Sequence, residues 1–189
     1  PPTKKTMLEG RLRRRLRATG AASFDDYCHF LFEGGALEEE TVHLIDAVTT
    51  NKTDFFREAR HFDYLSEVIL PASVRQGTQA VRAWSAACST GAEPYTLAMV
   101  LDHFAAQSRP FDYFILATDL STDVLTTAQA GVFHEEMTAP VPPPLRRRYV
   151  MPAVDPGQPQ VRIHPDLRSK VGFARLNLMD PSYPVGEPY

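Results

Sequence analysis

The chain has 189 residues, of which 43% are hydrophobic, and its formal net charge is -3. This composition supplies enough apolar surface for a packed core, which excludes a wholly disordered chain. No run of about 18 apolar residues predicts a transmembrane helix, and the N-terminus lacks the apolar run of a signal peptide. The two cysteines, Cys28 and Cys88, are too few for a disulfide framework, so we expect buried free thiols and a cytoplasmic location.

The first 50 residues predict a small helical domain. Apolar residues at spacings of about four predict a helix from about residue 4 to Thr19, which Gly20 ends. Ser23 is a candidate N-cap for a second helix, and residues 38–48 carry the apolar pattern of a third. Residues 1–20 hold seven Lys or Arg and one Glu, whereas residues 21–49 hold seven acidic residues and no basic one. A basic helix is therefore followed by acidic ones.

The polar run from 49 to 53 is a candidate boundary between a helical domain, 1–50, and a second domain, 51–189. A helix over about 54–70 follows it, for which Thr53 is a candidate N-cap. Asn51, Thr53 and Arg57 would share a face if this helix covers a cleft, because positions i and i+4 are neighbours on a helix.

The remainder alternates between strand and helix patterns. Strands are predicted over 80–86 and 111–117, the second leading to Asp119, with a helix after each. Later strand candidates are 161–163 and 171–174. This alternation predicts an α/β fold with a parallel sheet. The proline clusters between them, such as Pro142 to Pro144, predict loops.

The turn after the first strand, residues 87–92, is rich in small residues but is not a GxGxxG motif. Glu93 follows it and disfavours a phosphate, so a ligand with a positive group suits the turn better. Asp119, at the end of the second strand, is either a ribose ligand or the start of an Asx turn or helix cap. Together these residues suggest an adenosine ligand that lacks phosphates and carries a cation, such as S-adenosylmethionine.

Four segments resemble one protein family in the same order along the chain. They are Thr50 to Glu58 (TNKTDFFRE), Trp84 to Tyr95 (WSAACSTGAEPY), Ala117 to Asp119 and Leu176 to Leu178. The family is that of the chemotaxis receptor methyltransferases, the CheR family. Segments 11–16 and 23–27 resemble its N-terminal domain, so the resemblance spans nearly the whole chain.

This resemblance implies a small N-terminal helical domain followed by a Rossmann-like domain that uses S-adenosylmethionine. The family methylates glutamate side chains of membrane chemoreceptors, giving methyl esters and S-adenosylhomocysteine. Matched by position, Arg57 is the candidate catalytic residue, acting on groups at the sulfonium. The implied cofactor contacts are Asn51, Thr53 and Arg57 from the covering helix, Glu93 at the methionine part, Asp119 at the ribose, and Asn177 and Leu178 near the adenine.

The chemistry of carboxylate methylation is consistent with these residues. A carboxylate is already an anion at neutral pH, so the reaction needs alignment and water exclusion rather than a base or a metal. The implied partner is the cytoplasmic domain of a chemoreceptor, whose acidic methylation region the basic N-terminal helix would face. The six scattered histidines predict no metal site, and the chain's negative net charge disfavours nucleic acid.

Two departures from the family are expected. First, the sheet is predicted to be incomplete, without a later strand that carries an Asn-Arg pair, and the family's small β-subdomain has no evident counterpart. Second, the start at Pro1 is expected to lack part of the family's first helix. The alternative function is therefore a non-catalytic module that binds a receptor or signalling partner. A methyltransferase for another substrate is a third possibility.

Overall fold

The computed structural model describes residues 2–49, 52–108, 110–152, 157–183 and 185. The chain divides into two compact units, each of which is described by itself. The helical unit comprises residues 1–50 with 121–123, and the α/β unit comprises 51–120 and 124–189. No helix among the described residues is long and apolar enough to cross a membrane.

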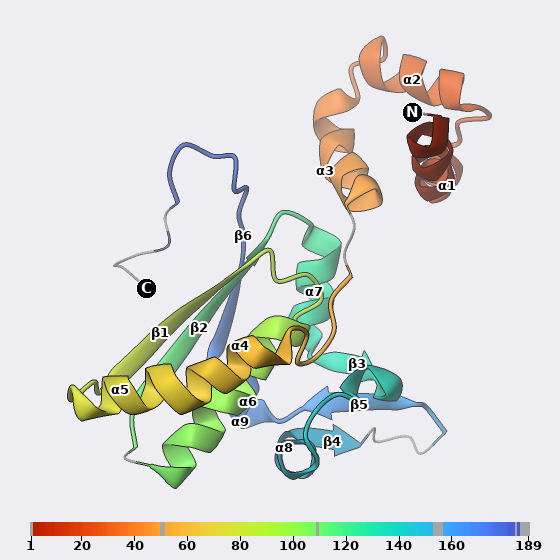
Figure 1. Ribbon diagram of the computed structural model, residues 1–189. Helices are drawn as coiled ribbons and strands as arrows, with labels where there is room; N and C mark the ends of the chain where they lie inside the picture. The colour runs from red at the N-terminus through yellow and green to blue at the C-terminus, as the bar shows by residue number, and fades with distance from the viewer. Residues whose placement is uncertain (1, 50–51, 109, 153–156, 184, 186–189) are drawn as a thin grey trace. The chain divides into compact units, whose positions relative to one another are not determined.

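The helical unit contains the three predicted helices. They are α1 (Pro2–Thr19), α2 (Phe24–Phe32) and α3 (Leu37–Val48) (Figure 1). Gly20 has a φ of 76°, a conformation that suits the residue after a helix end. The Ser23 hydroxyl accepts a hydrogen bond of 3.1 Å from the Asp26 N–H, which confirms the predicted cap.

An ion pair with a buried carboxylate connects α1 to α3. The Arg15 guanidinium donates to both carboxylate oxygens of Glu40, with 2.6 Å from Nε to Oε2, and Glu40 is only 5% exposed. The Tyr27 hydroxyl donates to the same oxygen at 3.0 Å. The hydrogen bond from Arg15 lowers the pKa of Glu40, and burial raises the pKa of Tyr27 to about 12.

Cys28 is exposed, so the prediction that both thiols are buried is wrong for this one. Tyr27 and Leu31, four positions apart, lie on the side of α2 that packs inward. Cys28 follows Tyr27 by one position, which turns it about 100° away from that side.

The helix expected over 54–70 begins later and ends later. It consists of α4 (Ala59–Tyr64), the π-helix η1 (Leu65–Ile69) and α5 (Leu70–Arg75). Thr53 therefore caps no helix. The π-helix ends two residues before Pro71, which has no N–H to donate to the carbonyl of residue 67, so the regular α-helical ladder is interrupted there.

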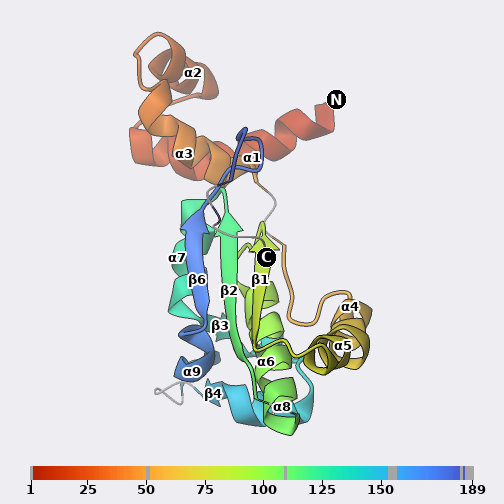
Figure 2. The ribbon, with the colours of Figure 1, turned by 90° about the vertical axis from the view of Figure 1, so that its left-hand side faces the viewer.

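The main sheet of the α/β unit is parallel, as predicted. Its strands are β1 (Ala80–Ala86), β2 (Asp112–Asp119) and β6 (Val171–Arg175), in the order β1-β2-β6. Helix α6 (Ala92–Gln107) packs on this sheet, and α7 (Thr122–Ala130) and α9 (Pro165–Arg168) precede later strands (Figures 1 and 2). Fully buried side chains of α6 and β2, such as Tyr95, Met99 and Ile115, form the core.

A second sheet forms where the sequence predicts loops and one strand. It is antiparallel, with β3 (Val132–His134), β5 (Gln160–Ile163) and β4 (Val150–Pro152) in that order. The expectation that the family's small β-subdomain has no counterpart here is therefore wrong. Strands of three or four residues are too short to show a clear alternating pattern.

Prolines begin a helix in this region rather than a loop. Pro143 and Pro144 occupy the first turn of α8 (Pro143–Tyr149), where a missing N–H costs nothing, and the 3-10 helix η2 (Glu135–Thr138) precedes it. The Tyr149 hydroxyl donates to Asp102 of α6 at 2.7 Å, which ties α8 to that helix. Figures 1 and 2 show the second sheet on the side of the amino ends of the main strands.

Candidate functional site

The carboxyl ends of β1, β2 and β6 meet at one edge of the main sheet, because the three strands are parallel. Asp119 is the last residue of β2 and pairs with Arg175 in β6. The Leu176 N–H donates to the Asp119 carbonyl at 2.9 Å, so the segment with Asn177 and Leu178 begins beside Asp119. Three of the segments singled out in the sequence thus converge at this edge.

The loop after β1 is bonded tightly to β2. The Cys88 N–H donates to the Thr118 carbonyl, and the Ser89 N–H donates to Oδ2 of Asp119, both at 2.8 Å. Ala87 and Ser89 have φ values of 61° and 51°, left-handed conformations that side chains disfavour. The loop is held in this strained form by the end of the neighbouring strand, and Asp119 is one of its anchors.

Gly91 closes the loop and cannot be replaced without rearrangement. Its φ is 94°, and a Cβ here would lie 2.9 Å from the Cβ of Ala128 and 3.3 Å from the ring of Tyr95. The close contact with α7 therefore requires glycine at the start of α6.

Glu93 lies in the first turn of α6, where a negative charge is favoured by the helix dipole. The hydroxyl of Ser85, on β1, donates to Oε1 of Glu93 at 2.6 Å. Ser85 is 1% exposed, whereas Glu93 is exposed, and no described residue is hydrogen-bonded to Oε2. The Ser85 hydroxyl thus holds one oxygen of an exposed carboxylate.

Asn177 and Leu178 follow β6 in a turn that the Asp180 N–H closes by donating to the Asn177 carbonyl at 3.0 Å. Oδ1 of Asn177 accepts from the Met179 N–H at 3.0 Å, and the side chain of Leu178 is exposed. The Tyr183 hydroxyl donates to the Leu178 carbonyl at 2.5 Å, and its ring lies 5.7 Å from that of Trp84 between centroids. Trp84 is partly buried, and its indole N–H donates to the Thr118 hydroxyl at 2.9 Å.

Thr53 and Arg57 lie before the helix rather than on it. The i,i+4 argument for a shared helical face is therefore wrong, and Asn51 lies outside the described residues. The exposed Arg57 side chain donates to the Lys52 carbonyl at 3.1 Å. The segment that contains Arg57 is bonded to α6, because the Phe56 N–H donates to the Thr96 hydroxyl at 3.2 Å.

Cys88 is buried within the loop, as expected. Burial raises the pKa of its thiol to about 12, and the negative charge of Asp119 acts in the same direction. The thiol therefore stays protonated at neutral pH and is no nucleophile. No group of His, Cys, Asp and Glu side chains among the described residues is arranged to hold a metal ion.

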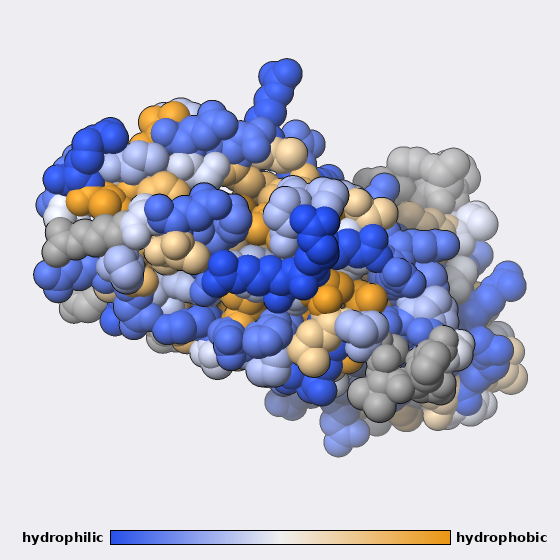
Figure 3. Space-filling view, turned by 90° about the horizontal axis from the view of Figure 1, so that it is seen from below, coloured by the Kyte–Doolittle hydropathy of each residue, from blue (hydrophilic) through white to orange (hydrophobic). Residues whose placement is uncertain are grey.

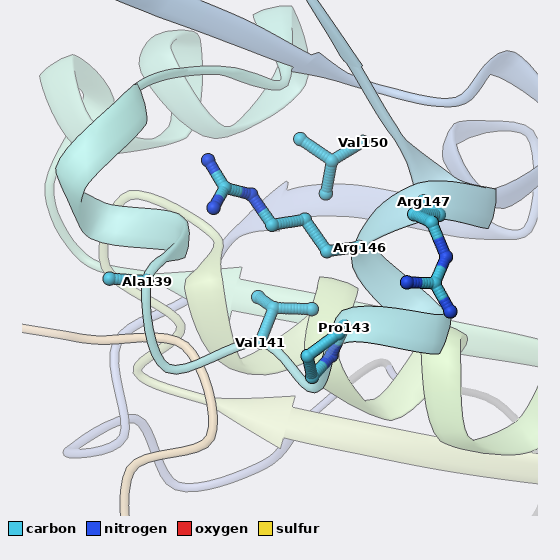
Figure 4. A pocket seen from close by; sticks show the side chains of 6 residues that line it. All are labelled: Ala139, Val141, Pro143, Arg146, Arg147 and Val150. Carbon is cyan, nitrogen blue, oxygen red and sulfur yellow. The ribbon is translucent and has the colours of Figure 1, made fainter.

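A separate surface hollow of about 460 Å³ lies beside α8. It is lined by Ala139, Val141, Pro143, Arg146, Arg147 and Val150 (Figure 4). Arg146 is paired with Glu135 at 2.8 Å, and the hollow contains none of the predicted site residues. On the face shown in Figure 3, apolar side chains form several small patches among polar ones.

The structure adds two side chains that the sequence analysis did not single out. Ser85 is a polar residue one position before the end of β1, next to a small-residue loop, and that position is a usable signal. Thr96 gives no such signal, because its role depends on a contact with Phe56, 40 residues away along the chain.

Comparison with known proteins places these features in one family. Residues 51–188 match the family model described as the SAM binding domain of CheR methyltransferase, and residues 1–49 match its all-alpha domain. Curated relatives are similar to this chain along nearly all of its own length. Chemotaxis protein methyltransferases of Borreliella burgdorferi and Escherichia coli are 36% and 37% identical over 98% of this chain.

A third relative, chemotaxis protein methyltransferase 2 of Pseudomonas aeruginosa, is 35% identical over 97% of the chain. The matched region covers 66%, 63% and 63% of these three relatives, so the chain spans less than two thirds of their length. Both family models and the identities agree, and this chain belongs to the CheR methyltransferase family.

Proposed function

We propose that this chain binds S-adenosylmethionine at the carboxyl edge of β1, β2 and β6, and that the protein methylates glutamate side chains of chemoreceptors. The observation that carries the proposal is the fixed pair of carboxylates at this edge. Ser85 holds Glu93, which follows the strained loop after β1, and the Ser89 N–H within that loop donates to Asp119 at the end of β2.

The residues at the edge suit the chemical groups of this cofactor. Asp119 accepts hydrogen bonds, as a ribose hydroxyl requires, and the exposed carboxylate of Glu93 suits an ammonium group. Asn177 and Leu178 supply a polar and an apolar side chain for the adenine. Two carboxylates disfavour a phosphate here, which separates this site from dinucleotide sites of similar topology.

When bound, the cofactor supplies a methyl group on a cationic sulfonium, and a substrate carboxylate oxygen bonds to that methyl carbon as the carbon–sulfur bond breaks. The residues of this chain align the two groups and exclude water. Arg57 is the proposed catalytic residue because its long cationic side chain can orient a carboxylate. Thr53 and Asn51 complete the proposed cofactor contacts from the same segment.

The helical unit is the proposed receptor-binding part. Arg11 donates to the carbonyls of Val48 and Thr49, and Arg15 is paired with Glu40, so both act within the unit. Arg13 and Arg17 are exposed on the same helix, and Arg14, also exposed, is paired with Asp123 at 3.5 Å. Their charge suits the acidic methylation region of the cytoplasmic domain of a membrane chemoreceptor.

The cofactor proposal is tested by calorimetric titration with S-adenosylhomocysteine. Replacing Asp119 by Ala is expected to weaken binding by about tenfold or more, because a charge-assisted hydrogen bond and a loop anchor are lost. Asp112→Ala, at the other end of β2, is the matched control and should bind as the unchanged chain does. Equal affinity of the Asp119→Ala variant would refute the assignment of this residue.

The substrate proposal is tested with labelled methyl groups, the protein at its natural length and membranes that contain chemoreceptors. The expected product is receptor label that is released by mild base, as methyl esters are. Base-stable label would indicate a different substrate group. Cofactor binding without any transfer would favour a non-catalytic binding module.

A further inference from the structure

Two strained residues flank Arg57. Phe56 and Glu58 have φ values of 53° and 56°, in the left-handed region that residues with a Cβ rarely adopt. Such strain persists only where the surrounding structure fixes the backbone. The contacts of this turn therefore show what holds Arg57 in place.

Two contacts fix the turn. Phe55 is 1% exposed, and its ring packs edge-on against that of Phe133 with 4.9 Å between centroids. The next residue, Phe56, donates its N–H to the hydroxyl of Thr96 at 3.2 Å and packs against Phe62. The first contact buries one side of the segment, and the second bonds its backbone to α6.

Thr96 is fully buried, and its hydroxyl is used in both directions. It donates to the Ala92 carbonyl at 2.8 Å and accepts from the Phe56 N–H. Thr96 also follows Glu93 by three positions, so the two residues are neighbours on the helix surface. The Thr96 hydroxyl therefore bonds the strained turn to the start of α6, where Glu93 also lies.

We propose that Thr96 is a positioning residue. It holds the turn from Phe56 to Glu58 against the start of α6, so that Arg57 is directed to the ligand that Glu93 binds. Thr96 acts through the backbone and does not itself contact the ligand. This inference rests on the proposed function only in the identity of the ligand, because the hydrogen bond and the strain belong to the chain alone.

The first test is hydrogen exchange of single amides and needs no ligand. In the unchanged chain the Phe56 amide should exchange more slowly than that of Glu58, for which no backbone partner is found among the described residues. Thr96→Val, which keeps the shape but removes the hydroxyl, should speed exchange at Phe56 by about tenfold, the effect of one lost hydrogen bond. Thr96→Ser restores the hydroxyl and should keep exchange within about twofold of the unchanged chain. Equal exchange at Phe56 and Glu58 in the unchanged chain would overturn the proposal, even if the Val variant fails to fold.

The second test is a double-mutant cycle on binding of S-adenosylhomocysteine. Thr96→Val is expected to weaken binding by about tenfold when Arg57 is present and by less than about twofold in an Arg57→Ala background. If the two substitutions weakened binding additively, Thr96 would act on general stability, and a role through Arg57 would be refuted. Absence of binding by the unchanged chain would contradict the proposed cofactor, while the exchange measurement would still decide the role of Thr96.

Discussion

The helical unit and the α/β unit are stabilised by different means. In the helical unit, the buried apolar side chains of the core cluster are Leu16, Tyr27 and Leu31, and an ion pair between Arg15 and the buried Glu40 lies beside them. The α/β unit has a continuous core that reaches from α6 through the main sheet to the second sheet. Small units bury a smaller fraction of their surface, so specific polar contacts matter more in them.

This difference matters for function because each unit is proposed to do a different task. The large core of the α/β unit supports a strained loop and a strained turn, which cost free energy at the candidate cofactor site. The helical unit presents charged side chains, and its own stability also depends on charge. The predictions below test this division from the largest effect to the smallest.

Truncating the large core should have the greatest effect. Ile115 is fully buried in β2, and Ile115→Ala is expected to lower the free energy of unfolding of the α/β unit by about 4 kcal/mol. Denaturant unfolding followed by the fluorescence of Trp84, the single tryptophan, reports on this unit. A loss below about 1 kcal/mol would mean that the core is loosely packed.

Breaking the ion pair should affect the helical unit alone. Arg15→Ala leaves the Glu40 carboxylate buried without its cationic partner, and we expect a loss of about 3 kcal/mol. Hydrogen exchange of amides in α2 and α3 measures the change, with α6 as internal reference. Arg13→Ala, an exposed position on the same helix, is the control and should change stability by less than about 0.5 kcal/mol. Equal effects of the two substitutions would contradict the stabilising role of the pair.

Lowering the pH should reduce the stability of the helical unit by less than the Arg15→Ala substitution does. The pKa of Glu40 is lowered by Arg15 in the folded chain, so the unfolded chain takes up the proton first as the pH falls. Ionised Glu40 therefore makes its full contribution to the free energy of unfolding above the ordinary pKa of a glutamate, about 4.3. That contribution is lost as the pH falls toward the lowered pKa of Glu40 in the folded chain. Exchange in α2 and α3, measured between pH 6 and 3, should show this loss, and Glu40→Gln should remove it. If exchange in the Glu40→Gln variant depended on pH as it does in the unchanged chain, the loss of stability would belong to other carboxylates.

The smallest of these effects concerns the cofactor site. Ser85→Ala removes the hydroxyl that holds Glu93 and is expected to weaken binding of S-adenosylhomocysteine about tenfold, or ~1.4 kcal/mol. The control is a ligand rather than a variant. 5′-Methylthioadenosine lacks the ammonium and carboxylate groups, so its affinity should not change. Equal losses for both ligands would mean that Ser85 supports the whole loop and not Glu93.

The sequence predicts most of the fold because strong local patterns are present. Gly20 marks the end of α1 and Ser23 marks the start of α2, by conformations and hydrogen bonds that depend only on neighbouring residues. The apolar runs of β1 and β2 predict buried parallel strands. The second sheet was missed because its strands are short and are separated by prolines, and its pairing depends on contacts far apart in sequence.

The candidate site is predictable in part for the same reason. Glu93 and Asp119 follow directly after a strand or its loop, so their place at the sheet edge follows from topology. Thr53 and Arg57 were expected on a helix, but the segment adopts a strained turn fixed by Phe55 and Thr96. No local pattern specifies that turn, because its stability comes from distant parts of the fold.

The central claim is that the loops at the carboxyl edge of the main sheet, with the turn at Arg57, form the cofactor site. The most direct test is hydrogen exchange of the unchanged chain with and without S-adenosylhomocysteine. We predict slower exchange in residues 85–93, 117–120 and 53–58, with no change in α2 and α3. Protection confined to the hollow beside α8, or no protection at 85–93 under saturating ligand, would contradict the account.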